Sequence, residues 1–242
     1  MCARVLALCF ALVALAQPCA AAAGETKEFL TLAESAMRAA RAATHYLRTE
    51  NPAVASIELA TARKRWTTLA ERFAQELPDV FEGNGAFPDI FARIDELWAK
   101  AHDLLREGRI QAARDGVEQG IEQYRKARRA SWLFAYSDCI VEMNRAVDAL
   151  WRWRGQQPIA LDDPGTRRRI AAQTAIARYL YRRCREEAPS ELRDEEFERL
   201  FEGALASLEA MSAAVEQRDA GRFLRILLEL RSFDRLLRFH YG

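Results

Sequence analysis

Runs of β-branched residues are missing from this 242-residue sequence, and their absence argues against a β-sheet. Alanine, leucine, arginine and glutamate dominate instead, and all four are good helix formers. Half of the residues are hydrophobic and 29% are charged, which is typical of a folded chain and argues against disorder. We therefore expect an all-α protein.

The motifs of several enzyme classes are also missing. There is no G-x-S-x-G nucleophile elbow and no His-Glu-x-x-His zinc motif. Glu-x-x-His pairs, which di-iron sites need on facing helices, do not occur either. No glycine-rich phosphate loop follows a strand, because no strand is predicted. We therefore expect no catalytic activity.

An excess of one charge sign is lacking as well. The chain has 36 basic and 35 acidic residues, and removal of residues 1–23 would leave 35 of each because it takes away only Arg4. A net charge near zero gives no electrostatic reason to bind nucleic acid or an anionic membrane. The expected partner is a protein or a small apolar ligand.

Only the first residues form a long apolar run. Arg4 precedes the run Val5–Ala16, and Ala20–Ala23 supplies the small residues that a signal peptidase needs. We interpret residues 1–23 as a cleaved signal peptide, too short for a membrane anchor. The expected location is the periplasm or the exterior, without membrane insertion after cleavage. Cys139 and Cys184 then remain, in a compartment that permits disulfides.

Apolar residues recur at intervals of three and four along the rest of the chain, which predicts eight amphipathic helices. Asn51 and Pro52 are suited to the N-cap and first turn of the second helix. Short connections favour up-down-up-down bundles. The expected boundaries are about 27–48 for the first helix, 52–77 for the second, 132–154 for the fifth, 194–215 for the seventh and 221–242 for the eighth.

The second half of the chain repeats the layout of the first. Two stretches of the first half, around Met37 and Pro78, match stretches around Met143 and Pro189 in the second. We therefore expect two tandem four-helix units, residues 24–130 and 131–242. A tetratricopeptide array is the competing interpretation, although nothing recurs at its 34-residue period. The matched residues are Met37, Ala40, Ala43, Leu69, Arg72, Glu76 and Pro78 with Met143, Ala146, Ala149, Leu180, Arg183, Glu187 and Pro189.

The stretch Arg109–Arg154 joins these two units. It contains no proline and reads as helical throughout. It is either one continuous rod or two helices separated between about Arg128 and Tyr136. The five tryptophans recur at helical spacing and are expected in the core, although Trp151 and Trp153 cannot share one helix face.

The segment Ala99–Arg129, with the turn Leu104–Ile110, resembles the last helical hairpin of the periplasmic four-helix cytochromes, namely the soluble b-type cytochrome and cytochrome c-prime. The resemblance extends loosely over each unit, and it implies a four-helix fold. The C-x-x-C-H haem attachment of cytochrome c-prime is absent. In the first unit the b-type histidine position falls near Arg128. In the second unit Met143 and His240 fall close to the b-type methionine and histidine ligands.

An up-down-up-down bundle would bring Cys139, Met143, Cys184 and His240 to one end of the second unit, where all four are expected to face inward. Three interpretations follow: a Cys139–Cys184 disulfide, non-covalent haem b on Met143 and His240, or a copper site on all four side chains. We favour the disulfide, with no cofactor. The expected function is that of an exported, non-catalytic binding or accessory protein. The alternative is a haem or copper carrier, or an electron-transfer protein, that uses the second unit.

Overall fold

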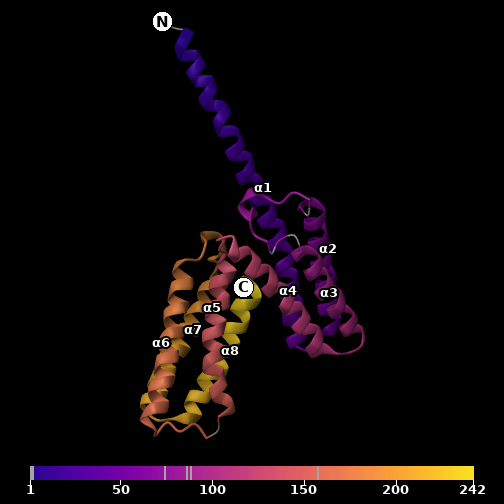
Figure 1. The fold of residues 1–242 in the computed structure, drawn as a ribbon. Coiled ribbons are helices and arrows are strands. Elements are labelled where there is room, and N and C mark those ends of the chain that lie inside the picture. Colours follow the sequence, from indigo (N-terminus) through magenta and orange to yellow (C-terminus); the bar gives the residue numbers. More distant parts are fainter. Residues whose placement is uncertain (1–2, 74, 86, 88, 157) are drawn as a thin grey trace. The chain divides into compact units, whose positions relative to one another are not determined.

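The computed structural model describes residues 3–73, 75–85, 87, 89–156 and 158–242, with side chains from residue 23 onward. This described part of the chain contains helices, turns and bends but no strand, so the predicted all-α class is confirmed. Two compact units divide the chain, Met1–Leu133 and Phe134–Gly242 (Figure 1). Apart from Ala23, the predicted signal peptide lies outside the described side chains.

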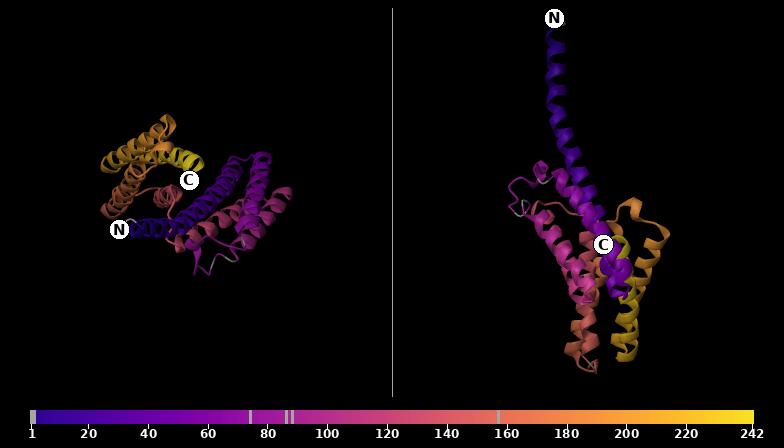
Figure 2. Two further views of the ribbon diagram at one scale, coloured as in Figure 1. Left: turned by 90° about the horizontal axis from the view of Figure 1, so that it is seen from above. Right: turned by 90° about the vertical axis from the view of Figure 1, so that its right-hand side faces the viewer.

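The first unit contains four long helices and one short 3-10 turn. Each of α1 and α3 packs against both α2 and α4 (Figures 1 and 2). Asn51 accepts a hydrogen bond from Val54 N at 3.3 Å, and Pro52 begins α2, as predicted. The elements are α1 (Ala3–Arg48), α2 (Pro52–Phe73), η1 (Asp79–Phe81), α3 (Ile90–Arg106) and α4 (Ile110–Ala130).

The second unit has the same number of long helices. Here α5 packs against α6 and α8, and α7 contacts the same two helices. Asp163, Asp194 and Asp219 accept N-cap hydrogen bonds from the first turns of α6, α7 and α8. The elements are α5 (Tyr136–Trp151), η2 (Arg152–Gly155), α6 (Pro164–Glu186), η3 (Ser190–Leu192), α7 (Glu195–Glu216) and α8 (Ala220–Tyr241).

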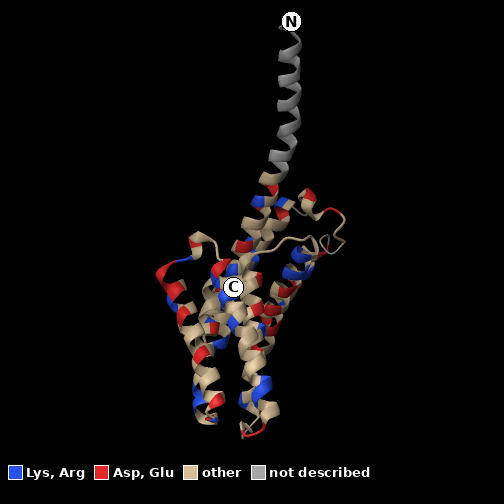
Figure 3. Cartoon of the chain, turned by 90° about the vertical axis from the view of Figure 1, so that its left-hand side faces the viewer, with Lys and Arg blue, Asp and Glu red and all other residues tan. Residues whose placement is uncertain are grey.

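Each unit has its own apolar core. Aromatic side chains fill the first: Phe29 packs against Phe73 and Phe81, and Trp66 packs against Trp98. The core of the second unit contains Met143, as the stripe on the fifth helix predicts. Charged residues of both signs are interspersed along the helices (Figure 3). Among the helices of the described part, none holds a stretch long and apolar enough to cross a bilayer.

The stretch that joins the units is broken, and the predicted start of the fifth helix at Trp132 is wrong. Residues 131–135 separate α4 from α5. Trp132 has a left-handed backbone, φ 59°, which ends α4. The Asp138 carboxylate then accepts a hydrogen bond from Ala135 N at 3.1 Å, which fixes the start of α5 at Tyr136. The break falls inside the interval that the sequence left open.

Gly120 lets α3 and α4 approach closely. A Cβ at this position would lie 2.3 Å from Trp98 Nε1, whose indole N–H donates to Val117 O at 3.3 Å. Gly116, one turn earlier, is less crowded, since its Cβ would lie 3.3 Å from Ala101 Cβ. Of these two positions, only Gly120 requires glycine to avoid a severe overlap.

We predict that Gly120→Ala lowers the free energy of unfolding by about 1–3 kcal/mol because the added methyl overlaps the buried indole. Helix propensity alone would make either glycine-to-alanine change stabilising by about 1 kcal/mol. Gly116→Ala is the matched control and should cost less than Gly120→Ala. Urea unfolding of both variants measures the difference. Equal free energies for the two variants would contradict the packing argument.

Candidate functional site

The two cysteines of the second unit meet at one end of α5 and α6. Their sulfur atoms lie at disulfide distance, with the Cα atoms 5.7 Å apart, as the preferred interpretation predicted. The Tyr136 hydroxyl donates to Cys184 O at 3.1 Å beside the pair. Closing a loop of this size stabilises a fold by about 4 kcal/mol in the chain-entropy model. Sulfurs bonded to each other do not offer thiolate ligands to a metal.

Met143 and His240 do not face the same space. Met143 is fully buried, whereas His240 is exposed, so the expectation of an inward His240 is wrong. Successive helical residues are rotated by about 100°, and it is the next residue, Tyr241, that turns toward the unit. Its ring lies 5.2 Å from the ring of Phe197, and its hydroxyl donates to Asp194 Oδ1 at 2.9 Å.

The two histidines of the first unit do not belong to a metal-binding group of side chains within the described part of the chain. His45 and His102 are both half-buried, at the boundary of the core, and His102 Nε2 lies 3.3 Å from Ser56 Oγ. Among the described residues, no group of three or more His, Cys, Asp or Glu side chains is arranged to hold a metal ion. Copper ligation by Cys139, Cys184, Met143 and His240 thus lacks a common centre.

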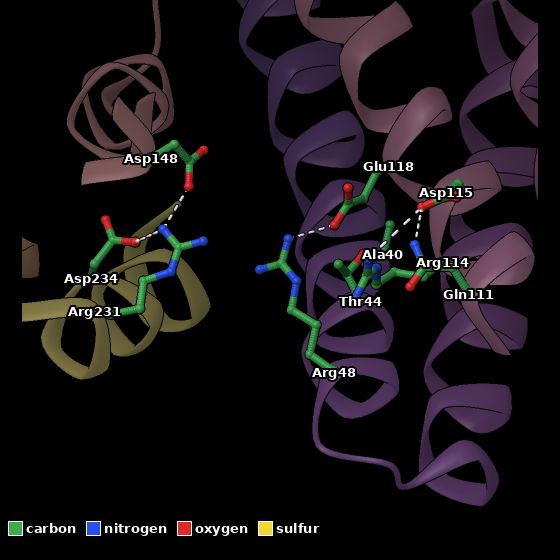
Figure 4. A network of polar contacts seen from close by, with 10 residues as sticks. All are labelled: Ala40, Thr44, Arg48, Gln111, Arg114, Asp115, Glu118, Asp148, Arg231 and Asp234. Atoms are coloured by element: carbon green, nitrogen blue, oxygen red, sulfur yellow. Dashed lines mark hydrogen bonds and ion pairs between the residues drawn. The ribbon is translucent and has the colours of Figure 1, made fainter. Parts of the chain in front are cut away.

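A buried carboxylate, which sequence reasoning missed, connects three helices of the second unit. Asp234 on α8 is only 2% exposed. Its Oδ1 accepts from Asn144 Nδ2 at 2.5 Å and from the Tyr181 hydroxyl at 3.2 Å. Its Oδ2 pairs with Arg231 Nη1 at 3.1 Å, and the same nitrogen reaches Asp148 Oδ1 at 2.6 Å (Figure 4). α5, α6 and α8 thus share one polar contact in the core.

The electrostatics of this contact follow from its burial. Burial raises the pKa of the Asp234 carboxyl above its ordinary value, while Arg231 opposes that rise. Burial likewise raises the pKa of Tyr181, which keeps its hydroxyl protonated as a donor. The sequence did carry a signal: Asp234 falls between Leu230 and Leu237, within the apolar stripe of its helix.

In the first unit Arg128, at the position that the resemblance aligns with the haem histidine, contributes contacts that stabilise the fold. Arg128 is 4% exposed, and its Nη1 donates to Leu133 O at 2.9 Å. Its guanidinium lies 5.9 Å from the centre of the Tyr124 ring. A permanently charged guanidinium is not a haem ligand.

Trp132 is the most exposed of the large apolar side chains, at 83%, so its expected place in the core is wrong. It occupies the left-handed position of a Schellman cap, in which Trp132 N donates to Arg129 O at 3.0 Å and Leu133 N to Arg128 O at 3.3 Å. The left-handed residue ends the helix, and Leu133, not Trp132, packs on the core of the first unit.

A surface groove of about 420 Å³ runs between α3 and α4. Leu97, Ala101 and Leu104 contribute apolar atoms to its wall, while Lys100 and Asp115 add charge. Gln111 Nε2 donates to the Asp115 carboxylate at 2.7 Å (Figure 4). Tight sites for small molecules enclose most of their ligand in a largely apolar cavity, and this mixed surface groove does not provide that enclosure.

We predict that Asp234→Asn removes a component of the pH dependence of stability. A raised pKa means that the folded chain binds this proton more tightly than the unfolded chain does. The stabilising contribution is therefore complete below the ordinary aspartate pKa, about 3.9, and is lost as the pH rises through the raised value. Unfolding free energies measured in urea from about pH 4 to 7 give the difference between variant and wild type.

Asp148→Asn serves as the control, because it removes a half-exposed carboxylate from the same arginine. Because the Asp148 charge itself helps to raise the pKa of Asp234, this control should keep the sign of the wild-type slope and reduce only its size. Parallel curves for Asp234→Asn and the wild type would exclude the proposed titration.

Comparison with known proteins returns no match: no family model fits the chain, and neither curated proteins nor solved structures resemble it significantly.

Proposed function

We propose that the chain is an exported, non-catalytic binding or accessory protein built from two tandem up-down-up-down four-helix units. The four-helix arrangement is supported by the packing of each long helix against two others in its own unit. Export is supported by the proximity of Cys139 and Cys184, since disulfides persist in oxidising compartments. A protein partner is the better supported ligand, because the α3–α4 groove is a partly charged groove at the surface.

The observation that carries this proposal is the conformation of Trp132. Schellman caps usually place glycine at the left-handed position, and Gly108 takes that place after α3. A residue with a Cβ costs roughly 1 kcal/mol or more in this conformation. Trp132 thus holds a large apolar side chain in solvent on a strained backbone. Backbone strain of this kind gathers at functional sites, and tryptophan is enriched at the energetic centres of protein interfaces.

Two other left-handed residues provide an internal comparison. Glu50 and Arg218 occupy the same cap position after α1 and α7, with φ 57° at each. Both are polar and suit an exposed cap, so they need no partner to explain their exposure. Trp132 shares their backbone conformation and their exposure but has a large apolar side chain, so the indole is the feature to be explained.

Haem or copper on Met143 and His240 is the weaker candidate. Met143 is buried where a bundle cofactor would lie, but His240 is exposed one position before the inward Tyr241. A shared axial pair would require α8 to turn by about 100° at its last turn, breaking the Tyr241–Asp194 hydrogen bond.

We predict that Trp132→Gly abolishes partner binding and at the same time raises the free energy of unfolding by about 1 kcal/mol, because glycine relieves the left-handed strain. Co-purification of partner proteins compares binding by the wild type and Trp132→Gly. Photo-crosslinking in cells that express the protein, with a photoreactive phenylalanine at position 132 of the otherwise wild-type chain, locates the contact. The same residue at positions 50 and 218 provides matched controls. Adducts should form at 132 and not at the controls.

Glu50→Gly and Arg218→Gly should gain similar stability without loss of binding. Loss of binding in Trp132→Gly could then not be attributed to unfolding. Equal adduct formation at all three positions, or none at 132, would contradict the proposed role of Trp132.

We also predict that the purified protein, mixed with haem, shows no Soret shift that depends on Met143 or His240. The expected spectra of wild type, Met143→Ala and His240→Ala are identical, because the two side chains do not face one centre. A Soret band lost in either variant would instead favour the haem carrier. Retention of Cu(I) by the wild type but not by Met143→Ala would favour the copper carrier.

A further inference from the structure

The outer surfaces of α6 and α7 carry opposite charges that the chain itself leaves unpaired. On α6, Arg168, Arg178 and Arg182 have no acidic partner within the described residues. On α7, Glu209 and Glu216 are exposed and likewise have no basic partner in the described part of the chain. Neighbouring helices of one unit thus present a basic row and an acidic row side by side.

The same surface is partly apolar. Tyr179 on α6 is 62% exposed, and Ala175 one turn before it is exposed too. Ala206 on α7 is also exposed, and it borders the groove that Arg182 and Glu209 line. Exposed apolar side chains between unpaired charges have the composition of an interface centre with a charged surround.

We propose that this α6–α7 face binds the α6–α7 face of a second copy, which makes the protein a twofold symmetric dimer. Most soluble homo-oligomers are twofold dimers, in which the same patch of each subunit forms the interface. The face is self-complementary because it contains both charge signs in separate rows. Charge complementarity therefore identifies the occupant as another copy of this chain.

Symmetry decides which rows meet. A twofold axis parallel to the helices places α6 of one copy over α7 of the other, so that basic and acidic rows face each other. An axis across the helices would place α6 over α6 and bring the arginine rows together, which like-charge repulsion disfavours. The charges thus select the parallel axis.

The register also follows, because rotation about an axis parallel to the helices leaves heights along them unchanged. Two contacts between α6 and α7 give these heights: Thr174 Oγ1 lies 3.6 Å from Met211 Sδ, and Arg185 Nη2 lies 3.1 Å from Glu202 Oε1. At this antiparallel register, Arg178 lies level with Glu209 to within about one helical turn, and Arg168 lies level with Glu216. Arg178 and Arg168 of one copy would therefore meet Glu209 and Glu216 of the other.

The α6–α7 face is large enough to form a specific interface. Two adjacent helices of 23 and 22 residues measure about 33 Å in length and about 20 Å in width together. The contact would cover about 600 Å² of each copy, which reaches the lower part of the range for specific interfaces. A dimer of this kind depends on salt, because its charge pairs surround rather than fill the apolar centre.

Charge exchange tests the proposal with the full chain. The α6 variant carries Arg168→Glu, Arg178→Glu and Arg182→Glu, and the α7 variant carries Glu209→Arg and Glu216→Arg. Sedimentation equilibrium should give a dimer for the wild type, and each variant alone should dissociate at least about a hundredfold more readily. An equimolar mixture of the two variants should recover the dimer, because each reversed row then faces its complement.

Lys64→Glu, Lys100→Glu and Arg225→Glu together provide the control, since they reverse three exposed charges outside the face. This control should remain a dimer. A monomeric wild type at high concentration, or a mixture that stays monomeric, would overturn the proposal. Circular dichroism of each variant confirms that it is folded.

Discussion

The left-handed cap at Trp132 is the constraint on which the division of the chain depends. Without it, the helical stretch from Arg109 onward has no proline to stop it. The cap turns Leu133 onto the core of the first unit, and its carbonyl receives the buried Arg128 guanidinium. α5 can then begin afresh at Tyr136 with its own capping carboxylate. One backbone conformation thus ends the first unit and frees the second to form a separate core.

The two cores use different kinds of contact at equivalent positions. Counted from the left-handed residues Gly108 and Arg218, Tyr124 and Asp234 occupy the same position on α4 and α8. Tyr124 packs its ring against Trp66 at 5.9 Å, so the first unit is closed there by aromatic contact. Asp234 instead collects donors from α5, α6 and α8. A buried charge is stable only when such donors surround it, which ties the second unit to one particular arrangement of those helices.

Periodic apolar residues made the helices and most of the core predictable. The stripes place Met37, Met143 and Trp66 inside, and all three are buried. The Cys139–Cys184 pair was predictable because two antiparallel neighbouring helices each carry one cysteine and can bring the two sulfur atoms together. The break near Trp132 could be placed only within an interval, because tryptophan gives no cap signal. Tertiary contacts determine where a non-glycine residue adopts the left-handed conformation. At Trp132 these are the contacts of Leu133 and Arg128.

The orientation of His240 was not predictable for a related reason. An error of one residue in helix register rotates a side chain by about 100°, and the end of a helix offers few apolar neighbours to fix that register. Tyr241 fixes it instead, through the Phe197 ring and the Asp194 carboxylate, which also caps α7. The role of Asp234 was not predictable from the stripe of α8 alone, because the donors that accommodate its carboxylate, Asn144 and Tyr181, lie on other helices.

Some helices of the second unit are joined by more polar contacts than others. The Cys139–Cys184 pair joins α5 to α6, and Asp234 joins both of them to α8. Polar contacts of α7 gather at its first half, where Arg185 pairs with Glu198 and Glu202. Its second half carries the unpaired Glu209 and Glu216 and rests mainly on apolar packing. In the proposed dimer this half of α7 receives the partner's arginines, so that association would stabilise the part of the helix that the chain's own polar contacts hold least.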